Sequence, residues 1–277
     1  MKTTITRNTR GLLILLRDAS GSMSDPMPKA GMSKAAFTAD ATNRVLAEVS
    51  ACCFRQETVR DYFDLAVLAY NGDLIERVAA NYTDIITPIS FLSMNPLRLE
   101  TRHVKEPDGA GGLVAHEVEF PVWAEALASG GTAMVGAFTR VHDLVADYLA
   151  SHPECPSVTV IHLTDGESTD GDPTGLANRL AGLGNENRDV VVYNCHISSS
   201  AHTTPILFPE TEAGLPDEAA RLLYRMSSPL PEAALNLAAT HGMPVLPASR
   251  AFMYNADAAA IIQLFDIGTR VNTEALR

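Results

Sequence analysis

Apolar runs of strand type alternate along this chain with longer segments in which apolar residues recur at helical spacing. The expected strands are 11–17, 63–70, 74–80, 157–164, 190–197 and a short one near 244–253. The expected helices are 33–54 with Ser33 as N-cap, one that begins at Thr132 and runs to about 149, 174–187, 217–228, 231–240 and 256–270. This alternation predicts an α/β fold with a doubly wound, mostly parallel six-stranded sheet and helices on both faces.

One strand of this sheet is expected to run antiparallel at an edge. Only Asn71-Gly72-Asp73 separates 63–70 from 74–80, and Asn-Gly is a turn sequence typical of β-hairpins. A parallel connection would need a dozen or more residues, so the second of these two strands reverses direction.

Residues 85–124 interrupt the alternation, because a connection of this length is too long for a simple loop. Two strand-like runs, Leu97–Lys105 and Leu113–Phe120, flank the turn-rich segment Pro107–Gly112. The pattern predicts a β-hairpin inserted into a single domain that spans 1–277.

Two roles are open for this insertion. It runs into the loop before Thr132, which favours an element that contacts a partner or gates a nearby site. The alternative is a hairpin that only extends the sheet or covers one of its faces. Trp123, near the end of the insertion, is expected to anchor it by packing.

Composition narrows the function. The chain carries 33 acidic against 21 basic residues, a formal net charge of −12, without a block of Lys or Arg, so nucleic acid and anionic membranes are poor candidates as partners. No stretch reaches the roughly 18 apolar residues of a membrane span, and no signal-type apolar core precedes the first strand. The four cysteines, Cys52, Cys53, Cys155 and Cys195, are expected as buried thiols rather than disulfides, which favours a cytoplasmic location.

Five oxygen-bearing side chains form the candidate site. Asp18, Ser20 and Ser22 follow the first strand, Thr132 opens a helix, and Asp165 follows the fourth strand. Open α/β sheets bind ligands at the carboxyl ends of their strands, where the two aspartates are expected. Oxygen ligands without nitrogen or sulfur indicate a hard divalent ion such as Mg²⁺. Each motif alone is also typical of a helix cap or a loop, so the prediction depends on their combination.

The pattern D-x-S-x-S…T…TDG resembles the metal-ion-dependent adhesion site of von Willebrand factor A (VWA) domains, with all five positions in the same order. The resemblance covers about 11–270 apart from the insertion. It implies a Rossmann-like VWA fold and a bound Mg²⁺, with Mn²⁺ or Ca²⁺ as alternatives. It also implies that an Asp or Glu of a protein partner completes the coordination of the ion.

The motifs look most like those of bacterial cytoplasmic VWA proteins associated with tellurium resistance and stress signalling, which are commonly associated with protein kinases and PP2C-type phosphatases. This resemblance implies a non-catalytic adaptor in a bacterial multiprotein system. A second reading is a VWA partner of a MoxR-type or chelatase AAA+ ATPase.

A Mg²⁺-dependent phosphotransferase is the third reading, because such enzymes also place an Asp after the first strand. Those that use D-x-D need a second carboxylate as acid and base, whereas this chain has Ser20 there and shows no obvious phosphate-binding lysine. Walker-type and G-x-S-x-G motifs are absent from the sequence. We therefore expect a protein that is not an enzyme.

Several neighbours of the site are expected to play lesser roles. Arg17 occupies a strand position that is usually apolar in the family, and its guanidinium needs a partner if it is buried. Asp25 and Glu167 are expected as solvated loop residues. His162 and His196 fall within strands without zinc-site spacing, which favours structural roles.

Overall fold

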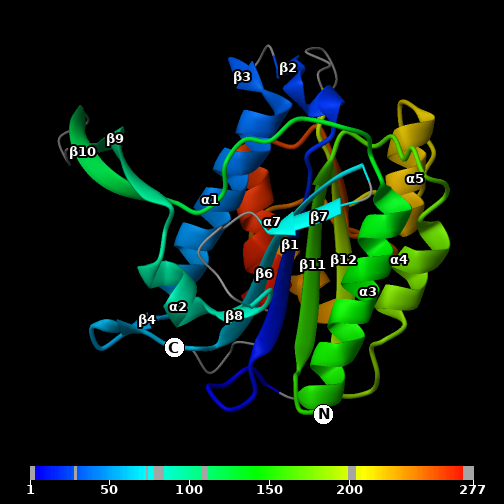
Figure 1. Cartoon of the computed structure of the whole chain (residues 1–277), viewed down its shortest axis with the longest axis horizontal. Coiled ribbons are helices and arrows are strands. Elements are labelled where there is room, and N and C mark those ends of the chain that lie inside the picture. The colour runs from blue at the N-terminus through cyan, green and yellow to red at the C-terminus, as the bar shows by residue number, and fades with distance from the viewer. Residues whose placement is uncertain are drawn as a thin grey trace.

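The computed structural model describes residues 4–27, 30–72, 74–77, 84–107, 112–198 and 204–270. One mixed sheet forms the centre of the molecule, and helices cover both of its faces (Figure 1). In spatial order its strands are β13 (Ile206–Leu207), β14 (Phe252–Tyr254), β12 (Asp189–His196), β11 (Ser157–Thr164), β1 (Gly11–Asp18), β6 (Phe63–Asn71) and β7 (Leu74–Arg77), and β8 (Thr87–Pro88) also pairs with β6.

The sheet confirms the predicted fold class. Strands β14, β12, β11, β1 and β6 are parallel, and β7 runs antiparallel to β6 as the Asn71-Gly72 turn predicted. The six expected strands, counted along the chain, lie in the order 3-2-1-4-5-6, the doubly wound arrangement. Two short antiparallel strands, β8 and β13, were not expected.

The two faces of the sheet carry different helices. On one side lie α1 (Lys34–Cys52), α6 (Glu232–Thr240) and α7 (Ala258–Arg270), and on the other α3 (Met134–Ser151), α4 (Thr174–Ala181) and α5 (Glu218–Met226) (Figure 1). Side chains of β1 alternate between the two cores, because successive residues of a strand point to opposite faces. Its eight residues are all buried, which makes β1 the centre of the fold.

Short elements surround this framework. They are the 3-10 helix η1 (Gly21–Ser24), the hairpin β2 (Pro26–Met27) and β3 (Met32–Ser33), the hairpin β4 (Phe54–Arg55) and β5 (Thr58–Val59), and the helix α2 (Ile89–Met94). The predicted N-cap of α1 is confirmed, since the Ser33 hydroxyl accepts a hydrogen bond from the Ala36 N–H.

Two predicted boundaries differ by several residues from the structure. The strand expected near 244–253 is only β14, because Pro244 and Pro247 cannot donate to a sheet ladder. Helix α4 ends at Ala181, where glycines follow, rather than at 187. Residues 78–80 of the expected third strand lie outside the described residues.

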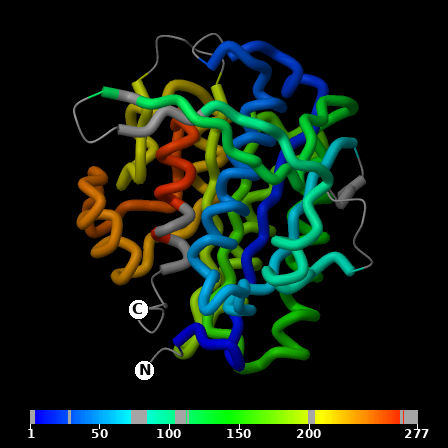
Figure 2. Tube along the Cα trace, turned by 90° about the vertical axis from the view of Figure 1, so that its left-hand side faces the viewer, coloured from blue at the N-terminus to red at the C-terminus, as the bar shows by residue number. Residues whose placement is uncertain are grey.

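The predicted hairpin within 85–124 is present. Strands β9 (Arg98–Pro107) and β10 (Leu113–Val122) pair antiparallel and form a two-stranded ribbon separate from the central sheet. The ribbon extends away from the body of the molecule and crosses α1 (Figures 1 and 2). Helix α2, which the sequence pattern did not reveal, precedes it and buries Ile89 and Leu92. Residues 108–111 of the expected turn lie outside the described part of the chain.

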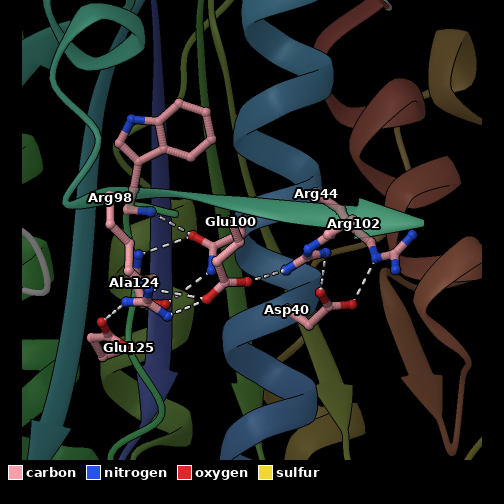
Figure 3. Close-up of polar contacts among 9 residues, drawn as sticks. Asp40, Arg44, Arg98, Glu100, Arg102, Ala124 and Glu125 are labelled. Carbon is pink, nitrogen blue, oxygen red and sulfur yellow. Dashed lines mark hydrogen bonds and ion pairs between the residues drawn. The ribbon is translucent and has the colours of Figure 1, made fainter. Parts of the chain in front are cut away.

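Charged side chains hold the near end of the ribbon on α1 (Figure 3). The Arg102 guanidinium bonds to Asp40 of α1 at 2.7 Å and pairs with Glu100, while Arg98 pairs with Glu100 and Glu125. The Arg102 guanidinium also lies 3.6 Å from the centre of the Phe120 ring, a cation–π contact. These half-exposed pairs fix orientation more than they add stability.

None of the helices in the described ranges is long and apolar enough to cross a membrane.

Candidate functional site

The two site aspartates lie at the carboxyl ends of adjacent parallel strands. Asp18 is the last residue of β1 and Asp165 directly follows β11, whose neighbour is β1. The direction in which successive strands are added to the sheet reverses between β1 and β11. The strands that follow β1 are added toward one edge of the sheet, and those that follow β11 toward the other. Such reversal points are where open α/β sheets bind ligands. The fold therefore brings together residues that are almost 150 positions apart.

The Asp18 carboxylate is buried and oriented by two hydrogen bonds. Its Oδ1 accepts from the Ser20 N–H at 2.8 Å, and its Oδ2 accepts from the Thr164 hydroxyl at 2.6 Å. Burial raises the pKa of Asp18, these hydrogen bonds oppose the shift, and the negative charge of Asp165 adds to it. Each carboxylate oxygen has a second lone pair, so Asp18 retains acceptor capacity for a ligand.

Backbone hydrogen bonds tie the hydroxyl-bearing loops to one another. The Gly21 N–H donates to the Gly130 carbonyl at 3.0 Å, and the Ser129 N–H donates to the Ala19 carbonyl at 2.7 Å. These bonds join the loop of Ser20 and Ser22 to the loop of Thr132. The Thr132 N–H donates to the Thr169 hydroxyl, and the Thr169 N–H donates to the Thr132 carbonyl. The loop that follows Asp165 is therefore bonded to the other two loops.

The spacing of two candidate donors suits a small divalent ion. Ser20 Oγ and Ser22 Oγ lie 3.2 Å apart, close to the ~2.9 Å between adjacent oxygens in an octahedral Mg²⁺ shell with bonds of about 2.05 Å. In the described part of the chain no three His, Cys, Asp or Glu side chains are grouped for metal binding. A metal at this place would therefore depend on the hydroxyls of Ser20, Ser22 and Thr132 together with the two aspartates.

One residue of the site was missed by the sequence pattern. The Lys34 ammonium at the start of α1 lies 3.0 Å from Asp165 Oδ2 and 3.3 Å from Asp25 Oδ2. The expectation that Asp25 is only a solvated loop residue is therefore incomplete, since it shares this ion pair. The available signal was a cation in the first turn of a helix, where the helix dipole disfavours positive charge.

Two further contacts shape the Asp165 loop. His196 Nε2 donates to the Asp165 carbonyl at 2.7 Å, a contact that fits the structural role expected for His196. Gly166 has a φ of +101°, and a Cβ built there would lie 2.9 Å from the Ala219 methyl and 3.1 Å from His196 Nε2. Only glycine both adopts this positive φ readily and leaves no Cβ to clash, so the turn after Asp165 requires the glycine of the TDG motif.

Arg17 is buried and lies beside the insertion. Its Nη2 donates to the Glu125 carbonyl at 2.9 Å, while its Nε lacks a partner among the described residues. Burial lowers the pKa of Arg17 to about 10. The expected need for a partner is thus met in part, by one carbonyl, and this bond holds the end of the insertion next to the site end of β1.

A buried chain of polar side chains runs beneath the site. Tyr70 Oη lies 2.8 Å from His162 Nε2, His162 Nδ1 lies 2.8 Å from Asn194 Oδ1, and Asn194 Nδ2 donates to the Ser227 hydroxyl. Because Asn194 Oδ1 only accepts, His162 donates from Nδ1 and accepts the tyrosine proton at Nε2. His162 is therefore neutral and structural, as the sequence predicted. Burial lowers its pKa to about 4.

The His162 network predicts a stability loss in acid. An unfolded His has a pKa of ~6.5 and binds a proton that the folded His162 does not bind until pH falls to about 4. Its stabilising contribution is therefore complete above pH 6.5 and is lost as the pH falls toward 4. Between pH 7 and 4.5 the wild-type free energy of unfolding should fall by about 2 kcal/mol more than that of His162→Gln. Urea titrations at both pH values measure this difference, and equal losses would contradict it.

Comparisons with known proteins leave the family open. No protein-family model matches the chain, and no curated protein matches it. A solved structure of the vWF domain of the type V pili tip protein Mfa5 from Porphyromonas gingivalis is similar at 12% identity, with a TM-score of 0.35 over 61% of this chain and 40% of that chain. A structure of three N-terminal domains of the same protein gives 13% identity and a TM-score of 0.33 over 58% of this chain and 20% of that chain. The matches thus span less than half of either neighbour, and likeness at this level assigns no family.

Proposed function

We propose that this chain is a non-catalytic, metal-dependent protein-binding module that acts as an adaptor in a bacterial multiprotein system linked to stress or defence signalling. The observation that carries the proposal is the grouping of Asp18 and Asp165 at adjacent strand ends, with Ser20, Ser22 and Thr132 on loops bonded to one another. This set matches the five motif positions that resemble a VWA adhesion site.

The resident ion would be Mg²⁺, with Mn²⁺ or Ca²⁺ as alternatives. Three of the five donors are neutral hydroxyls, so a bound ion keeps much of its positive charge and attracts a carboxylate. A domain with a net charge of −12 otherwise repels an acidic surface. The Asp or Glu of a partner would complete the shell, and partner binding would depend on the metal.

The location proposed for this adaptor is the bacterial cytoplasm. None of the four cysteines forms a disulfide, and Cys53, Cys155 and Cys195 are buried as expected from the sequence, whereas Cys52, also expected to be buried, is half-buried. Burial raises the pKa of each of these three thiols, which keeps them protonated and unreactive.

Capture from a lysate with and without metal tests the proposal. The immobilised wild-type chain should retain partners in millimolar Mg²⁺ and release them in EDTA. Thr132→Ala should lose the same partners while its thermal unfolding stays cooperative. Retention that is equal in Mg²⁺ and EDTA would place the interface elsewhere. A kinase or phosphatase among the captured proteins favours the signalling system, and an AAA+ ATPase favours the motor-partner alternative.

The phosphotransferase alternative gains one observation from the structure. Lys34 supplies a cation near the site that the sequence pattern did not reveal, but it contacts Asp165 and Asp25, and Ser20 still stands where a second carboxylate would act as acid and base. Hydrolysis of p-nitrophenyl phosphate with Mg²⁺ by the wild type, lost in Asp18→Asn, would replace the adaptor proposal with an enzyme.

A further inference from the structure

Lys34 is a buried cation in an electrostatically unfavourable position. It is the first residue of α1, where the positive end of the helix dipole lies, and no acidic residue occupies the first turn of that helix. Its side chain is only 7% exposed. Burial and the dipole both disfavour the ammonium, so the carboxylates beside it are what keep it there.

The ammonium lies between two carboxylates of different exposure. Asp165 is 9% exposed and belongs to the candidate metal site, whereas Asp25 is 57% exposed and lies at its rim. The backbone N–H of Lys34 donates to the backbone carbonyl of Asp25 at 3.0 Å, and this bond holds Asp25 beside Lys34. Because the ammonium already lies 3.3 Å from Asp25 Oδ2, a change of the Lys34 rotamer alone can move it away from Asp165 while it keeps this partner.

We propose that Lys34 is a tethered cation that competes with the divalent ion for Asp165, and that Asp25 receives the ammonium when the ion is bound. The inference rests on the metal site proposed above. A lysine and a divalent ion cannot both approach Asp165 closely without mutual repulsion, because like charges in a poorly solvated site interact strongly. The exposed carboxylate of Asp25 offers an alternative partner at little desolvation cost.

This arrangement keeps the affinity for the ion alone low. Asp18 and Asp165 would attract a cation strongly, but Lys34 neutralises one of these two charges in the metal-free state. Additional binding energy from the carboxylate of a partner would then be needed to hold the ion. Lys34 thus couples metal binding to partner binding at the same site.

Calorimetric titration of Mn²⁺ into Lys34 variants tests the competition. Lys34→Gln and Lys34→Met remove the ammonium and should bind Mn²⁺ about tenfold tighter or more than the wild type. Lys34→Arg keeps the charge and should stay near the wild type. Arg44→Gln is the matched control, because Arg44 is also on α1 and pairs with Asp40 outside the site. It changes the net charge equally and should leave the affinity unchanged.

The role of Asp25 is tested by a double-mutant cycle. Asp25→Asn should weaken Mn²⁺ binding in the wild type, because the ammonium loses its alternative partner. In the Lys34→Gln background the same change should have a clearly smaller effect, since its influence passes through the lysine. Equal effects in the two backgrounds would overturn the part assigned to Asp25.

The outcomes separate this inference from the proposed metal site. A wild type that binds Mn²⁺ as tightly as Lys34→Gln and Lys34→Met overturns the competition and leaves the metal site standing. If none of these chains binds Mn²⁺, the metal site and the competition fall together. Tight binding by the variants alongside weak binding by the wild type supports both. A rise in the unfolding temperature with added Mn²⁺, larger in Lys34→Gln, is the independent readout.

Discussion

Replacing Asp18 by Asn should remove most of the affinity for Mg²⁺ and Mn²⁺ and leave the fold in place. Asp18 supplies the one site carboxylate that Lys34 does not neutralise, so its charge dominates the attraction for an ion. Loss of that charge in a buried position should weaken binding about 100-fold or more. Asn retains the shape of the side chain and one oxygen to accept the Ser20 N–H, and the Thr164 hydroxyl can rotate to accept from the amide.

The metal-free variant should be at least as stable as the metal-free wild type. Burial raises the pKa of Asp18, so its ionised form destabilises the fold at neutral pH, and the amide carries no such penalty. Added Mg²⁺ at about 100 times its dissociation constant should stabilise the wild type by ~2.7 kcal/mol and leave Asp18→Asn unchanged.

Calorimetry and thermal unfolding measure both effects. Asp143→Asn is the control, since Asp143 is an exposed carboxylate of α3 and its loss changes the net charge equally. An Asp18→Asn chain that binds Mg²⁺ as the wild type does would refute the proposed site.

The sequence predicted the fold well because its strands are short apolar runs between helices of clear periodicity. The central strands are buried on both faces, so nearly every residue of their apolar runs belongs to the core. The Asn71-Gly72 turn sets the antiparallel edge. Elements that depend on partners were harder to predict. Helix α2 has six residues and little periodicity of its own, and it forms because Ile89 and Leu92 pack into the core.

The candidate site was likewise predictable only in part from the sequence. Asp18, Ser20, Ser22, Thr132 and Asp165 were identified by order and spacing, and the structure joins their loops by backbone hydrogen bonds. That they bind a metal stays a prediction. Lys34 was not identified, because it belongs to none of the three motifs and does not follow the end of a predicted strand, so the predicted fold did not indicate its contact with Asp165.

The role of Trp123 shows where the insertion becomes part of the core. The sequence favoured packing for this residue, and the structure buries it with 1% exposure. Its indole N–H donates to the Leu92 carbonyl of α2 at 2.7 Å, and its backbone N–H donates to Asn43 Oδ1 at 2.9 Å. Asn43 of α1 also bonds both backbone groups of Ala124. The base of the insertion is thus fixed on α1, whereas the ribbon extends beyond it.

Trp123→Ala should therefore destabilise the chain by about 3–5 kcal/mol, because it leaves a large cavity and removes the hydrogen bond from the indole N–H to the Leu92 carbonyl. Leu99→Ala on the ribbon is the control, since Leu99 is exposed and its loss should cost within ~0.5 kcal/mol. Urea denaturation measures both. A Trp123→Ala chain as stable as the control would show that the insertion is not anchored through this residue.

Shortening the ribbon separates its role from that of its base. Leu99 and Pro121 are paired across the two strands, so an Asn-Gly turn can join them in place of residues 100–120. The shortened chain loses the half-exposed ion pair between Arg102 and Asp40 but keeps Trp123, so it should retain most of its stability. If the ribbon contacts the partner, this chain should bind Mn²⁺ normally and capture less partner from lysate. Unchanged capture would leave the ribbon without a part in binding, and unfolding would show that residues 100–120 belong to the core as Trp123 does.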